Sequence, residues 1–203
     1  MKKINKEMIG LFASYPFIIT SGNPRINYEG VNNPFLRTYI EKIGELLSIK
    51  GNLNDLKIVY IGGYGKGKNC NPNDEVRAKL YLRAYNEYFE KVLGYPKDSL
   101  SLNNLTVVDY TDELESARIA IEDADFIFLG IGSDAKFKKT IDFLESNGII
   151  LNDIMKKNNT VLATICSGSV MTSKLIYGGE YDPYYYGSPK ITYPNNLTSI
   201  SCL

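Results

Sequence analysis

The ten residues 160–169, Thr-Val-Leu-Ala-Thr-Ile-Cys-Ser-Gly-Ser, decide which fold the sequence predicts. The first six are mostly apolar or β-branched and favour a buried strand, and a helix is expected over residues 169–176. A sharp turn between strand and helix would present Cys166, and Gly168 supplies the small residue that such a turn needs two places later. This is the pattern of a nucleophile elbow, although Thr164 stands where the pattern usually has glycine.

The thiol of Cys166 would lie at a helix N-terminus. There, unpaired backbone N–H groups and the helix dipole favour the thiolate form. However, the 203-residue chain contains no histidine, so neither a Cys–His nor a Ser–His catalytic pair can be assembled from it. A small buried cysteine at the end of a core strand is the alternative interpretation of the same residue.

Apolar runs alternate with helical patterns along the chain. The patterns predict strands at 17–20, 57–61, 105–109, 125–129 and 160–165, and helices at 34–50, 74–93, 111–123 and 134–147 with a short one ending near 157. Strands separated by helices indicate βαβ crossovers and a parallel sheet covered on both faces. We therefore expect an α/β fold, with one domain over residues 1–203 built as a three-layer sandwich around a mostly parallel central sheet.

The composition argues against several classes of partner. With 23 basic and 23 acidic residues the net charge is zero, which disfavours a nucleic acid or an anionic membrane surface. The three cysteines form no disulfide framework, which favours a cytoplasmic location. Residues 8–20 loosely imitate a signal peptide, but Pro16 interrupts the apolar run, and no run reaches the ~20 residues of a membrane span. With no histidine and scattered carboxylates, we expect no metal and no cofactor.

Two glycine-rich segments, 62–69 and 130–134, follow predicted strands and should meet at one edge of a parallel sheet. The first nearly matches the phosphate-binding pattern G-x-x-x-x-G-K-[ST]. Asn69 replaces the hydroxyl residue that binds Mg²⁺, and Pro72 delays the helix that should follow at once. A flexible loop at the edge of the sheet is therefore favoured over a phosphate site.

From about residue 15 to residue 182, the order of these parts resembles the peptidase E and cyanophycinase family, within the class I glutamine-amidotransferase-like superfamily. The most specific segment is Ala124-Asp-Phe-Ile-Phe-Leu-Gly-Ile-Gly-Ser-Asp-Ala-Lys-Phe137, which is similar to the family's strand followed by GGGNT. The second is Ile165-Cys-Ser-Gly-Ser169, which is similar to the family's Ser-Ala-Gly-Ala elbow. The resemblance implies a hydrolase that cleaves amide bonds in small peptides.

The resemblance also implies the residues of the site. Cys166 takes the place of the family's serine nucleophile, and the backbone N–H of Ser167 would help to form the oxyanion hole. Gly130 and Gly132 match the outer glycines of the second oxyanion loop, where Ile131 replaces the middle glycine. A cysteine at the elbow is instead typical of the amidotransferases, and a thiolate is a stronger nucleophile than an unassisted hydroxyl.

The family's catalytic histidine lies C-terminal to the elbow, and this chain stops near that point, so we interpret it as a shortened or a degenerate member. An acidic third partner would fall near Glu180 or Asp182, where a solvated loop carboxylate is the alternative. We expect a small peptide or amide as substrate, with weak or no turnover. The rival function is a non-catalytic protein that binds a ligand or a partner. An exposed tyrosine-rich tail over residues 177–203 would favour a homodimer.

Overall fold

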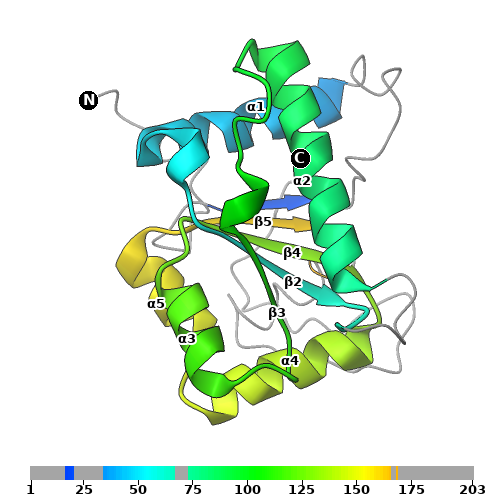
Figure 1. Cartoon of the computed structure of the whole chain (residues 1–203), viewed down its shortest axis with the longest axis vertical. Helices are drawn as coiled ribbons and strands as arrows, with labels where there is room; N and C mark the ends of the chain where they lie inside the picture. The colour runs from blue at the N-terminus through cyan, green and yellow to red at the C-terminus, as the bar shows by residue number, and fades with distance from the viewer. Residues whose placement is uncertain (1–16, 21–33, 67–72, 166–167, 169–203) are drawn as a thin grey trace, which may run out of the picture.

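The computed structural model describes residues 17–20, 34–66, 73–165 and 168. Within them, five strands form one sheet in which every strand pairing is parallel (Figure 1). The strands, in the spatial order β1-β5-β4-β2-β3, are β1 (Phe17–Thr20), β2 (Ile58–Gly63), β3 (Leu105–Val108), β4 (Phe126–Gly132) and β5 (Val161–Ile165). The α/β fold with a parallel sheet is confirmed for this part of the chain.

Helices cover both faces of the sheet (Figure 1). One face carries α1 (Pro34–Lys50) and α2 (Asp74–Leu93), and the other carries α3 (Leu114–Glu122), α4 (Asp134–Ser146) and α5 (Leu151–Asn158). Two 3-10 helices, η2 (Leu53–Asp55) and η3 (Leu102–Asn104), precede β2 and β3. The described residues therefore form three layers, helix on sheet on helix.

Two apolar cores lie between the layers, because successive side chains of a strand point to opposite faces of a sheet. In β2, Tyr60 faces α1 and α2, whereas Val59 and Ile61 face α3, α4 and α5. The core beneath α2 is rich in rings, and Tyr85 meets Phe128 edge-on with ring centroids 5.5 Å apart. Such pairs stabilise a fold by about 0.5–1.5 kcal/mol beyond the burial of their surface.

The bounds of α2 and α4 agree with the sequence because local capping fixes them. The side chain of Asn73 accepts the N–H of Val76 at 2.8 Å, which satisfies a donor in the first turn of α2. Gly94, at the end of α2, and Gly148, just past the C-cap of α4, are the residues that commonly follow the end of a helix.

Three bounds differ from the expectation by two residues or more. β2 continues through Gly62 to Gly63, residues that were expected in a loop. β4 continues through Gly130 to Gly132, residues that their glycine content had placed in a loop. α3 begins at Leu114 rather than at Thr111, because Thr111 belongs to a turn in which its N–H donates to Asp109 Oδ1 at 2.8 Å.

The topology of the sheet reverses at β2. From β2 the chain passes to β3 on one side, whereas from β4, on the other side of β2, it passes away from β2 to β5. The connections that leave the carboxyl ends of β2 and β4 therefore run in opposite directions. Open parallel sheets bind ligands in the crevice at such a point.

Candidate functional site

The two glycine-rich segments meet at the carboxyl ends of β2 and β4, as the sequence predicts. Gly63 and Gly132 are partners in the ladder, and the N–H of Ser133 donates to the Gly63 carbonyl at 2.8 Å. Gly132 has a φ of 148°, a backbone conformation that residues with a side chain rarely adopt. A Cβ atom at this position would also overlap the backbone of Gly63. Glycine at position 132 therefore allows the two glycine-rich segments to touch.

Gly130 lies inside β4, next to a buried ring. A Cβ atom at this position would overlap the hydroxyl group of Tyr60, so glycine leaves room for that side chain. The structure thus gives Gly130 a packing function and brings Gly132 against the turn after β2. The part in an oxyanion hole that the resemblance implies for both glycines stays a prediction.

The third feature of this edge is the end of β5. That strand ends at Ile165, and Gly168 is helical and buried. A Cβ atom on Gly168 would overlap the carbonyl oxygen of Leu129, so glycine lets the chain after β5 lie directly against β4. The functions implied for Cys166, Ser167, Glu180 and Asp182 stay predictions, because these residues lie outside the described ones.

We expect Gly168→Ala to lower the free energy of unfolding by about 1–3 kcal/mol, because the added methyl group meets the backbone of β4, which cannot rotate away. Gly44→Ala in α1 is the matched control, since its Cβ would meet chiefly the end of the Leu93 side chain, which can rotate. Urea unfolding followed by circular dichroism measures both. A Gly168→Ala variant as stable as the wild type would contradict the close contact.

A buried carboxylate binds the turn after β2. Asp74, the first residue of α2, is 0% exposed, and its Oδ2 accepts the N–H of Gly65 at 2.6 Å and that of Tyr64 at 3.1 Å. The N–H of Asp74 donates in return to the Gly65 carbonyl at 3.0 Å. Gly62 leaves room for this carboxylate, since a Cβ atom there would overlap Asp74 Oδ1.

A second carboxylate, that of Asp109 after β3, binds the next N–H of the same turn. Its Oδ2 accepts the N–H of Lys66 at 2.8 Å, and the Lys66 ammonium donates to the Val107 carbonyl at 2.9 Å and pairs with Asp112. Three consecutive N–H groups of the turn therefore bind the protein's own carboxylates, although a phosphate would need the same groups. This arrangement weighs against the phosphate site, and residues 64–66 are hydrogen-bonded to their neighbours.

Burial raises the pKa of Asp74 from 3.8 to about 6, and the Asp109 carboxylate adds to the rise. The N–H groups of Gly65 and Tyr64 and the ammonium of Lys136 act in the opposite direction. A carboxyl group that titrates near neutrality at this edge of the sheet is a candidate functional group. The sequence analysis missed it, because an aspartate in the first turn of a helix is ordinarily exposed beside the helix dipole. The available signal was the glycine run before α2, whose N–H groups need acceptors.

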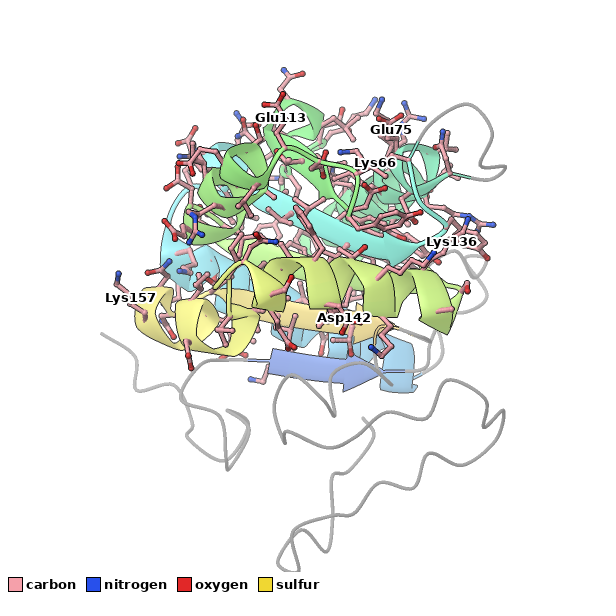
Figure 2. The ribbon with its side chains drawn as sticks, turned by 90° about the horizontal axis from the view of Figure 1, so that it is seen from below. Lys66, Glu75, Glu113, Lys136, Asp142 and Lys157 are labelled. Atoms are coloured by element: carbon pink, nitrogen blue, oxygen red, sulfur yellow. The ribbon has the colours of Figure 1, made fainter. Side chains whose placement is uncertain are left out.

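Two cations contact Tyr64 in the same turn. Lys136, in the first turn of α4, donates to the Tyr64 carbonyl at 2.7 Å, and the guanidinium of Arg77 lies 5.1 Å from the centre of the Tyr64 ring. Figure 2 shows Lys136 at the end of the molecule toward which the strands point, with Lys157 at the opposite end. Hydrogen bonds thus join the turn to α2, to the β3–α3 connection and to α4.

An open hollow of about 410 Å³ lies at the other end of the sheet, between β3 and α3. Its lining includes Ile119 and the ion pair between Lys57 and Asp123, whose charged atoms are 2.7 Å apart. It contains none of the site residues predicted from the sequence. Among the residues that the structure describes, no three histidine, cysteine or carboxylate side chains gather as metal ligands would.

Comparison with protein-family models and with curated proteins finds no match for this chain. In the described ranges, no helix combines the length and the apolar character needed to cross a membrane. The edge of the sheet at the carboxyl ends of β2 and β4 is therefore interpreted from its own geometry.

Proposed function

We propose that this chain is an acyl-transfer protein of the peptidase E kind, within the class I glutamine-amidotransferase-like superfamily, in which Cys166 attacks the carbonyl carbon of a small peptide or amide. The observation that carries the proposal is the change from strand to helix around Cys166. β5 ends at Ile165, and Gly168 is helical and buried against Leu129. The contact between Gly63 and Gly132 at the same edge of the sheet adds support.

The proposed chemistry starts from a Cys166 thiolate, which the sequence predicts at the start of a helix. The thiolate would attack the carbonyl carbon, and N–H groups of Ser167 and of Gly132 or a neighbouring residue would bind the oxyanion, each donor contributing about 3 kcal/mol. Collapse of the intermediate expels the leaving group and leaves a thioester on Cys166, which water then hydrolyses. A peptide amine needs a proton in order to leave, whereas nitrophenolate leaves as an anion.

The lack of histidine limits this reaction on amides. Loss of a general acid–base catalyst costs roughly 10²–10⁴ in rate. We therefore expect activated esters to acylate the protein and peptides to be cleaved weakly or not at all.

Mixing the protein with p-nitrophenyl acetate is expected to release about one equivalent of nitrophenolate in a burst, because the thioester forms faster than it hydrolyses. Mass spectrometry of peptides should place the acetyl group on Cys166. The Cys166→Ala variant should lose the burst, and Cys70→Ala should keep it. Small Asp-containing dipeptides are tested in parallel for slow cleavage. Equal background hydrolysis of ester and dipeptide by the wild type and Cys166→Ala would contradict the proposal.

A non-catalytic protein that binds a ligand or a partner is the second candidate, and the lack of histidine favours it. It predicts no burst. It also predicts that Cys166 is a core thiol, which iodoacetamide labels more slowly than Cys70 and Cys202 at every pH. Burst and labelling together distinguish the two functions.

A further inference from the structure

We infer that Asp74 is a positioning residue for the proposed acyl transfer: its carboxylate fixes the turn after β2, and that turn fixes Gly132 at the end of β4, where the oxyanion would bind. The inference rests on the proposed function, because the position of Gly132 matters to the reaction only if an oxyanion forms beside it. Two sets of contacts among described residues carry it.

The first set joins α2 to the turn after β2. Asp74 Oδ2 accepts two backbone N–H groups, at 2.6 Å from Gly65 and 3.1 Å from Tyr64, and the N–H of Asp74 donates to the Gly65 carbonyl at 3.0 Å. Asp74 is 0% exposed, so water does not readily replace its carboxylate. Each buried N–H group left without an acceptor would cost about 1–3 kcal/mol. Without this carboxylate, the turn is expected to move.

The second set joins the same turn to α4. The Gly63 carbonyl accepts the N–H of Ser133 at 2.8 Å, and the Tyr64 carbonyl accepts the ammonium of Lys136 at 2.7 Å. In addition, the backbone of Gly132, the last residue of β4, lies directly against the backbone of Gly63. A shift of residues 63–65 therefore shifts the start of α4 and Gly132. A displacement of about 1 Å at a catalytic group can cost up to about a hundredfold in rate.

The protonation state of Asp74 should modulate this positioning. Among the described residues, the charged groups that act on it are Lys136 from α4 and Asp109 from the β3–α3 connection, and the ring of Tyr60 lies beside it at Gly62. An ionised carboxylate accepts N–H groups more strongly than the neutral acid does. Because the pKa of Asp74 is about 6, the turn should be held less firmly below that pH.

The test compares two reactions of Cys166 in the same preparation, between about pH 5 and pH 8. Alkylation by iodoacetamide depends on the thiolate alone, whereas acylation by p-nitrophenyl acetate also requires an oxyanion. The ratio of the two rates therefore reports on the oxyanion site. We expect Asp74→Ala to lower this ratio about ten- to a hundredfold. In the wild type, the ratio should fall below about pH 6.

Two further variants separate positioning from a general structural role. In Asp74→Asn the amide oxygen can accept the same N–H groups, so the ratio should stay within about threefold of the wild type and be independent of pH. Glu75→Ala is the matched control, because Glu75 is an exposed acid in the same turn of α2 (Figure 2), and its ratio should equal that of the wild type.

The outcomes are distinguishable. A wild type that is alkylated at Cys166 but never acylated overturns the proposed function and this inference with it. A wild type that is acylated, with an unchanged ratio in Asp74→Ala, overturns this inference alone. If Asp74→Ala does not fold, the pH profiles of the wild type and Asp74→Asn decide, and two parallel profiles would overturn the inference.

Discussion

Raising the pH from about 4 to about 7 should destabilise the wild-type protein by about 2 kcal/mol relative to its Asp74→Asn variant. The folded state keeps the Asp74 proton up to about pH 6, whereas the unfolded chain releases it near 3.8. Between these values the folded state binds more protons, so its stability falls as the pH rises, and above them the loss is constant. Urea unfolding of both proteins across this range measures the difference, because asparagine carries no titrating proton.

The control for this experiment is Glu75→Gln, an exposed change from acid to amide in the same helical turn. Its difference from the wild type should stay within about 0.5 kcal/mol at every pH. If the difference between the wild type and Asp74→Asn does not change with pH, the pKa of Asp74 is not raised by folding as described above. If it changes with the opposite sign, the site stabilises the ionised carboxylate.

The second large effect is expected at Gly132, where Gly132→Ala should lower the free energy of unfolding by about 4 kcal/mol. Two costs combine there: a φ of 148° strains any residue that has a Cβ, and the Cβ would overlap the backbone of Gly63. Gly51→Ala separates them, because Gly51 has a φ of 133° with no atom within 4 Å of the added Cβ. This control should lose only about 2 kcal/mol.

Thermal or urea unfolding of the two glycine variants measures the contact directly, as the difference between their losses. Equal losses would mean that the two turns do not touch as closely as described. The same Gly132→Ala protein, if folded, should also show a lower ratio of acylation to alkylation at Cys166, since the turn is displaced.

The sequence predicted the regular elements well where local chemistry decides them. Asn73 and Gly94 bound α2 by capping that involves neighbouring residues only, so the helix was predicted from Asp74 to Leu93. The end of β4 was misjudged, because Gly130 and Gly132 look like loop residues until their neighbours are known. Tyr60 and Gly63 come from another strand, and no local pattern shows that they need glycine beside them.

The candidate site was predicted in outline only. The meeting of the two glycine-rich turns followed from the rule that parallel strands end at one edge of the sheet. Asp74 could not be found in the same way, since its contacts are with the backbone of residues 64–65 and its raised pKa comes from its burial, which no local pattern shows. The function implied for Cys166 remains to be tested by the burst experiment.

The Lys66 side chain has a consequence for how copies of this protein behave beside one another. β3 is the outermost strand on its side of the described sheet, and an outermost strand can recruit further strands from other molecules. Here the Lys66 ammonium donates a hydrogen bond to the Val107 carbonyl of β3, and the Leu105 N–H donates to the Leu102 carbonyl. A second chain that extended the sheet along β3 would have to displace the lysine from this carbonyl. We therefore expect the residue that secures the turn after β2 to disfavour association of copies through this edge as well.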